Sequence, residues 1–334
     1  MKKPVLLINS GTSFNRLNDC RLLSLLFGIC LMIALLSNGS VLPFNYADNG
    51  LGTNWTLVFH DDFTGTSLNR TNWAPYWFSD GTLNPGSNTR GYASNVTVNG
   101  QLNLLLRNST NGACISSNPH GGAKTGFQFT YGYAEAQITL PTNSGVIAHW
   151  PAWWLDGQSW PMDGEIDIME GLSGHAAWHY HYDSGGGLDS HPIGGNVNTS
   201  PGTHIYGVNW DPGHLDFYYD GTRVASASNA SLSGGATISS SPMYLILLYD
   251  AGGSGPVPAT MVVHYARVFQ STPPLSALPT NGAVLLSWNA LGFILQTNGD
   301  LTNPAVWGDV PDATNSPTTM TIGSVSLFFR LRHE

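Results

Sequence analysis

Short stretches of alternating apolar and polar residues recur from about residue 40 onward, separated by clusters of Gly, Asn, Asp and Pro. A period of two is typical of β-strands, and short strands joined by frequent turns are typical of a β-sandwich. Patterns of helical period are nearly absent from this part of the chain. The pattern therefore predicts an all-β protein, with its clearest strands at residues 102–107, 134–140, 205–210, 215–219, 244–249 and 261–269.

The same pattern divides the chain into two β-rich parts. Alternation stops at Ser271, and the Pro pair that follows predicts a linker over residues 272–279. Further strand-like runs predict a small C-terminal β module over residues 280–334. We expect its Trp288 and Trp307 to belong mainly to its core, and the role of the module stays open.

The first 40 residues predict a secretory signal peptide. Basic residues lead into an uncharged, mostly apolar run of 15 residues from Leu22 to Leu36, which is short of the roughly 20 needed to span a bilayer. An uncleaved anchor is the alternative. We expect a secreted protein whose main domain covers residues 41–271. Because Cys20 and Cys30 lie in the leader, only Cys114 remains, and no intramolecular disulfide is expected.

The amino-acid composition limits the classes of molecule that the protein is expected to bind. The chain is 42% hydrophobic and only 10% charged, with a formal net charge of −9. Nucleic-acid binding is not expected, because phosphate backbones attract Lys and Arg. A surface that is polar mainly through Asn, Ser, Thr and Gly suits a secreted protein that handles neutral polymers. We expect a monomer without stable membrane association.

Residues 163–170 carry the candidate chemistry, reading Asp-Gly-Glu-Ile-Asp-Ile-Met-Glu. In a regular strand Glu165 and Asp167 share a face and Glu170 lies on the other. A β-bulge around Ile168–Met169 would return Glu170 to the carboxylate face. Two carboxyl groups about 5–5.5 Å apart are what a retaining glycosidase needs. A solvated acidic edge strand is the alternative interpretation.

The octet resembles the signature of glycoside hydrolase family 16 in its bulged, laminarinase-like form. Other segments are similar to this family in the same order, namely residues 55–63, 95–102, 131–136, 150–154, 206–221 and 261–270. The resemblance implies a β-jelly roll with a substrate cleft on its concave face. It also implies that Glu165 is the nucleophile, that Glu170 is the general acid/base, and that Asp167 lies between them and hydrogen-bonds Glu165. Spacing alone does not assign the two glutamates.

Aromatic residues gather around the acids in the sequence, and sugar rings stack on indoles. The candidate substrate-binding residues are Trp150, Trp154, Trp160, Trp178 and His179, with Trp160 the best candidate for stacking. Because Trp153 and Trp154 are adjacent in a strand, one should face the cleft and the other the core. Residues 184–201, rich in Gly and Ser, predict a mobile loop beside the cleft.

No cofactor and no metal site are expected. The resemblance would place an aspartate ligand of a structural calcium where this chain has His264, and calcium prefers oxygen ligands. Calcium binding is therefore doubtful. Gln137 also replaces an arginine that is usual in the family.

The sequence thus predicts a secreted retaining endo-glycosidase that hydrolyses β-1,3-glucan or mixed β-1,3/1,4-glucan. One alternative is a galactan hydrolase of the agarose type on the same fold, with sulfated galactans disfavoured by the scarcity of Lys and Arg. The other is a carbohydrate-binding protein that has lost catalysis. The expected partner is a polysaccharide substrate.

Overall fold

The computed structural model describes residues 6–8, 55–84, 86–117, 126–193, 202–271, 275–280, 283–288, 293–299, 307–311, 316–321 and 327–333. One compact unit is Trp55–Ser271, and the described residues outside this range belong to a second unit. The division falls at Ser271, where the sequence predicts the domain boundary. The described residues contain no α-helix.

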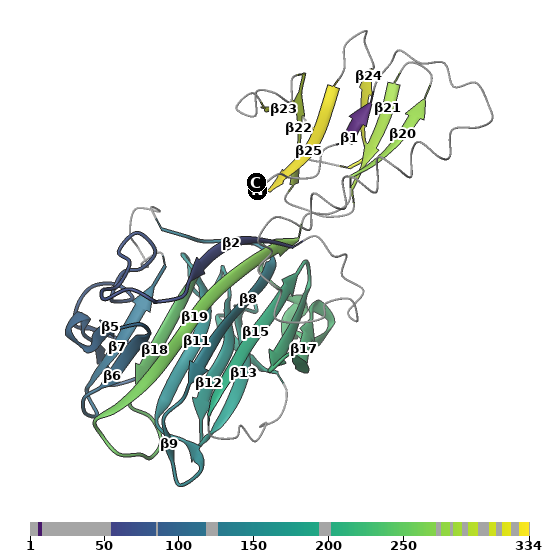
Figure 1. Cartoon of the computed structure of the whole chain (residues 1–334). Helices are drawn as coiled ribbons and strands as arrows, with labels where there is room; N and C mark the ends of the chain where they lie inside the picture. Colours follow the sequence, from purple (N-terminus) through teal and green to yellow (C-terminus); the bar gives the residue numbers. More distant parts are fainter. Residues whose placement is uncertain are drawn as a thin grey trace. The chain divides into compact units, whose positions relative to one another are not determined.

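The larger unit is a β-jelly-roll sandwich of two sheets (Figure 1). In the first, here called the cleft sheet, the strand order is β14 (Leu188–Pro192), β13 (His175–Asp183), β12 (Glu165–Leu172), β11 (Trp150–Gly157), β18 (Met243–Asp250), β7 (Asn111–Ser116), β4 (Arg90–Gly91) and β3 (Thr82–Leu83). In the opposite sheet the order is β17 (Thr222–Ser228), β16 (His214–Tyr219), β15 (Thr203–Asp211), β8 (Gly132–Thr139), β19 (Ala259–Ser271), β6 (Leu102–Leu106) and β5 (Val96–Val98), and β2 (Trp55–Asp61) also pairs with β19. All six strands that the alternation predicts most clearly are present.

Short elements connect these strands. They are the hairpin of β9 (Thr142–Asn143) and β10 (Val146–Ile147), and the 3₁₀ turns η2 (Ala93–Asn95), η3 (Asn229–Ser231) and η4 (Ser233–Gly235). Ser144 and Gly145 join β9 to β10, and both have positive φ. Two central residues of positive φ match the right-handed twist of a hairpin.

The core lies between the two sheets because each strand turns alternate side chains inward. In β6, Leu102, Leu104 and Leu106 are fully buried, while the residues between them are partly exposed. Burying an aliphatic or aromatic side chain stabilises the fold by about 1.5–3 kcal/mol. Since β18 is buried on both faces, the outer face of the cleft sheet must also be covered there. A second apolar cluster provides this cover, formed by Cys114, Ala152, Trp154, Tyr244, Ile246 and Leu248 with Trp77 packed against it.

The second unit has two small sheets. One has the order β1 (Leu6–Ile8), β25 (Leu327–His333), β22 (Phe293–Asn298) and β23 (Gly308–Asp309), and the other β20 (Ser276–Thr280), β21 (Ala283–Ser287) and β24 (Thr318–Thr321). Trp288 lies in its core, as expected. Trp307 instead packs under the Arg330 guanidinium, 4.3 Å from the ring centroid.

The predicted linker over residues 272–279 is too long. Ser276–Thr280 forms β20, which pairs with β21, and Leu275 and Ala277 pack against the core of the module. Pro279 obscured this strand in the sequence, but an edge strand tolerates proline because its outer N–H groups need no partner.

The N-terminal region is described only at β1, which pairs with β25 and lies within the predicted signal peptide. The apolar run Leu22–Leu36, the predicted cleavage region and residues 41–54 lie outside the described residues. No helix in the described part of the chain is long and apolar enough to cross a membrane.

Candidate active site

A β-bulge in β12 brings the three predicted acids to one face. On the β11 side, Trp153 pairs with Met169 and Trp154 with Asp167, so Ile168 is the additional residue. The register with β13 shifts over the same residues, between Asp167 and Glu170. The predicted bulge is therefore confirmed. Glu165, Asp167 and Glu170 all line one cavity of about 380 Å³ on the outer face of the cleft sheet.

Each glutamate accepts a hydrogen bond from an indole N–H. Trp160 donates to Glu165 from the turn before β12, and Trp150 Nε1 donates to Glu170 Oε1 over 3.0 Å from the start of β11. The other oxygen of Glu170 lies 2.7 Å from Nδ1 of His179. The indoles thus fix the two carboxyl groups without the flexibility of Lys or Arg side chains.

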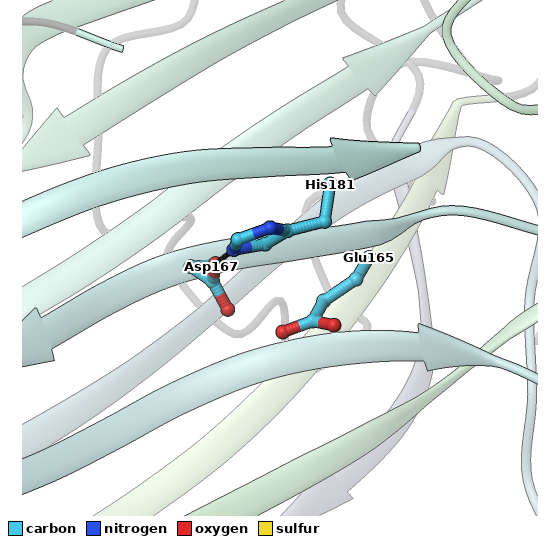
Figure 2. Close-up of side chains that lie close together, drawn as sticks. All are labelled: Glu165, Asp167 and His181. Carbon is cyan, nitrogen blue, oxygen red and sulfur yellow. Dashed lines mark ion pairs between the residues drawn. The ribbon is translucent and has the colours of Figure 1, made fainter. Parts of the chain in front are cut away.

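A second histidine contacts the middle acid. His181 Nε2 lies 3.1 Å from Asp167 Oδ2, and Figure 2 shows the Glu165 carboxyl group beside this pair. His179 and His181 are two residues apart on β13, so both point to the carboxylate face. This period of two could have identified His181 in the sequence, where it was missed as a site residue.

Burial and crowding raise the proton affinity of the cluster. Burial raises the pKa of Glu165 well above its usual range, and the charge of Asp167 adds to this, while His181 and the Trp160 N–H oppose it. The pKa of Asp167 is also raised, first by burial and then by the charge of Glu170. The titration therefore belongs to the cluster rather than to any one carboxyl group. Such a site retains a proton at a pH where isolated carboxyl groups are ionised.

The predicted aromatic residues divide between cavity and core. Trp150, Trp154, Trp160 and His179 line the cavity, and Trp160 is 42% exposed at its rim. Trp153 is buried in the core behind Trp154, as the alternation predicts.

The assignment of Trp178 to substrate binding is wrong. Its side chain is only 1% exposed and lies in the core between the sheets. Residues of β13 alternate between outward and inward, so with His179 and His181 facing the cavity, Trp178 must face inward.

One wall of the cavity comes from the segment predicted as a mobile loop. Residues 188–192 form β14 at the edge of the cleft sheet, and Leu188 and Ser190 line the cavity. The Gly-rich turn before β14 obscured this strand in the sequence. Residues 194–201 of the same segment lie outside the described residues.

Two sets of side chains have a spacing that could hold a metal ion. Ligand atoms of Glu165, Asp167 and His181 lie within 4.8 Å of one another, as do those of Asp167, Glu170 and His179. Within these sets, His181 Nε2 contacts Asp167 Oδ2, and His179 Nδ1 contacts Glu170 Oε2. At the position expected for calcium, His264 Nε2 contacts Thr139 Oγ1 at 2.9 Å. An imidazole nitrogen does not fit calcium, which takes six to eight oxygen ligands.

The family model described as glycosyl hydrolases family 16 matches residues 86–267, so the chain belongs to this family. Its sequence is 26% identical over 260 residues to the glucan endo-1,3-beta-glucosidase A1 of Niallia circulans, covering 64% of this chain and 38% of that protein. It is also 26% identical over 270 residues to the keratan-sulfate endo-1,4-beta-galactosidase of Sphingobacterium multivorum, covering 72% of this chain and 61% of that protein. The chain thus spans less than two thirds of the length of either relative.

Among solved structures, the laminarinase from Flavobacterium sp. UMI-01 is similar to this chain with a TM-score of 0.52 and 25% sequence identity. The similarity covers 64% of this chain and all of that one. It agrees with the sandwich fold of the larger unit.

Proposed function

We propose that this protein is a retaining endo-glycosidase that hydrolyses β-1,3-glucan or mixed β-1,3/1,4-glucan. The observation that carries the proposal is the bulged strand β12, which gathers Glu165, Asp167 and Glu170 in one cavity, with an indole N–H bonded to each glutamate. A retaining glycosidase requires two carboxyl groups that flank the scissile bond.

In the proposed mechanism, Glu165 attacks the anomeric carbon while Glu170 donates a proton to the departing glycosidic oxygen. Water, deprotonated by Glu170, then releases the sugar from Glu165, so two inversions give net retention. The Trp160 N–H stabilises the ionised form of Glu165. His179 orients the carboxyl group of Glu170, and Asp167 holds a proton between the two glutamates.

The lining of the cavity favours a neutral polymer. None of the described residues that line it is Lys or Arg, whereas tryptophans occupy three of its positions. Neutral sugars present C–H faces that stack on indoles, while sulfated sugars call for basic side chains. The Niallia relative, named as an endo-1,3-beta-glucosidase, supports glucan as the substrate.

The second candidate function is that of a galactan hydrolase on the same fold. It is favoured by the similarity to the Sphingobacterium galactosidase, which covers the larger share of this chain. The name of that relative specifies a sulfated substrate, for which the acidic cavity of this chain is poorly suited. A non-catalytic binding protein is disfavoured because all three acids are present.

The test is release of reducing ends from laminarin, mixed-linkage β-glucan, agarose and keratan sulfate by the full chain. We expect activity on laminarin or mixed-linkage glucan, and a loss of about a thousandfold in Glu165→Gln and in Glu170→Gln. Asp167→Asn should impair activity without abolishing it. Activity on agarose or keratan sulfate alone would establish the second candidate function, and binding without hydrolysis would establish the non-catalytic alternative.

We also propose that the enzyme is secreted as a monomer after cleavage of the leader near residue 40. The basic residues before the apolar run Leu22–Leu36 support export. Cleavage would remove β1 from the module. N-terminal sequencing of the mature protein decides this, since a mature chain that retains residues 6–8 would contradict cleavage near residue 40.

A further inference from the structure

A fourth carboxyl group lies buried beside the acid cluster. Asp156 of β11 pairs with Glu165 on one side and with Tyr244 of β18 on the other. Asp156 and Tyr244 are both completely buried. Nothing in the proposed mechanism uses either residue.

These two residues belong to a hydrogen-bonded chain that reaches the wall of the cavity. Tyr244 Oη donates to Asp156 Oδ2 over 2.7 Å, and Trp77 Nε1 donates to Tyr244 Oη over 2.9 Å. The Trp77 ring lies 5.7 Å from that of Trp154, which lines the cavity. The chain therefore links the strand position beside Glu165 to the segment that covers the outer face of β18.

We propose that Asp156 is a positioning residue for the hydrolytic reaction, which fixes Trp77 against Trp154 through Tyr244 and places a titratable charge beside Glu165. This inference rests on the proposed function, because it assigns Asp156 a role in the reaction of Glu165. Asp156 is not a catalytic residue, since it is sealed from the cavity.

Electrostatics support a coupling between Asp156 and the acid cluster. Burial raises the pKa of Asp156, and the charge of Glu165 raises it further, while the hydrogen bond from Tyr244 lowers it. The charge of Asp156 in turn raises the pKa of Asp167. Such Coulomb coupling is reciprocal, so an ionised Asp156 opposes the ionisation that Glu165 needs to act as a nucleophile.

The surroundings of Asp156 contain few other titratable groups. Those on the strands and turn around it, among the described residues, are Glu165 and Asp167 of β12, His181 of β13, Tyr244 of β18, Cys114 of β7 and Asp163 of the turn between β11 and β12. Cys114 is buried and its pKa is raised by burial, so it stays neutral. No Lys or Arg stands among these groups to neutralise the charge of Asp156.

The experiment compares the pH dependence of kcat/KM in the wild type, in Asp156→Asn and in Tyr244→Phe. The acid limb of this profile reports ionisation of the free enzyme. Removing the charge of Asp156 should move the acid limb to lower pH. Tyr244→Phe should move it in the same direction by less, because Asp156 without its donor stays protonated to higher pH.

The same variants test the positioning of Trp77. Both should raise KM for a glucan oligosaccharide by about fivefold, the effect of one buried hydrogen bond, with a smaller change in kcat. The matched control is Glu135→Gln, which alters a buried carboxyl group on the opposite sheet and should leave the acid limb in place.

An acid limb that stays fixed in Asp156→Asn, or that moves equally in Glu135→Gln, would overturn the inference. If Asp156→Asn does not fold, Tyr244→Phe tests the inference through the same two measurements, the position of the acid limb and the KM. A wild-type protein inactive on the whole polysaccharide panel would instead refute the proposed function, so the two failures are distinguishable.

Discussion

At the scale of single residues, the two indole N–H groups distinguish this site from a simple row of acids. Trp160, in the turn that precedes β12, donates a hydrogen bond to Glu165, and Trp150, at the start of β11, donates one to Glu170. Each glutamate is thus held by a rigid ring that also borders the cavity. The sequence predicted Trp160 as a stacking platform, and its bond to Glu165 gives it a second role that no pattern of residue types could indicate.

Replacing Trp160 with Phe tests this second role, because it keeps an aromatic ring and removes the donor. The Trp160 N–H lowers the pKa of Glu165. Its loss should therefore move the acid limb of kcat/KM to higher pH, opposite to the change expected for Asp156→Asn. A hydrogen bond to a charged group contributes about 1.5–3 kcal/mol, so kcat/KM should fall by at least about tenfold at neutral pH.

Trp153→Phe is the matched control, since Trp153 lies in the core directly behind the cavity wall. It should lower thermal stability and leave the acid limb unchanged. If the acid limb of Trp160→Phe coincides with that of the wild type, the indole does not tune Glu165.

At the scale of elements, the bulge in β12 determines the chemistry. If β12 were a regular strand without the bulge at Ile168, the spacing Glu165-Asp167-Glu170 would direct Glu170 into the core. Ligand atoms of Asp167 lie within 4.8 Å of those of Glu165, and also within 4.8 Å of those of Glu170. We therefore predict that the enzyme itself attacks as the nucleophile, as in retaining glycosidases.

The stereochemistry of the product tests the bulge directly. The first-formed product from a β-glucan should carry the β configuration at its new reducing end. Proton NMR at early times, before mutarotation, distinguishes the two anomers. An initial α-anomer would mean that water attacks directly and that Glu165 is not the nucleophile.

The sequence could predict that most strands exist, but not the features that depend on pairing with a neighbouring strand. The alternation of apolar and polar residues in β6 and β19 predicts strands with one apolar face turned inward. The spacing of the acids in β12 predicts a bulge, because only a bulge brings all three to one face. The alternation of side chains along a strand implies that Trp178 points inward if His179 points outward. The prediction that Trp178 binds substrate followed the clustering of aromatic residues near the acids instead. Strands β14 and β20 were missed because glycine before one and proline within the other indicate loops. Pairing with a neighbouring strand overrides these local signals.

At the scale of the whole molecule, buried carboxyl groups should make stability depend on pH. Glu135 is completely buried in β8, and burial raises its pKa from 4.5 to about 7. Between these values the folded state binds a proton that the unfolded state releases, so stability falls as the pH rises. The loss by pH 8 is about 3 kcal/mol for this group alone.

Denaturant unfolding at pH 5 and pH 8 measures this effect. The wild type should be less stable at pH 8, and Glu135→Gln, which stays neutral, should lose less stability over the same range. The difference between the two proteins at pH 5 serves as the internal reference for packing. Equal losses in both proteins would show that Glu135 is ionised, or compensated, in the folded state.

The two units should also be separable. Every residue of the acid cluster, both indole donors and both histidines lie within Trp55–Ser271, a unit with its own core. Domains that bury separate cores usually fold alone. A protein truncated to residues 55–271 should therefore fold and keep the kcat/KM of the full chain on soluble oligosaccharides. Activity on insoluble polymer would fall only if the module targets the enzyme, and comparison of both substrates separates targeting from catalysis. An insoluble truncated protein, or one inactive on oligosaccharides, would mean that the sandwich needs the C-terminal residues to complete its core.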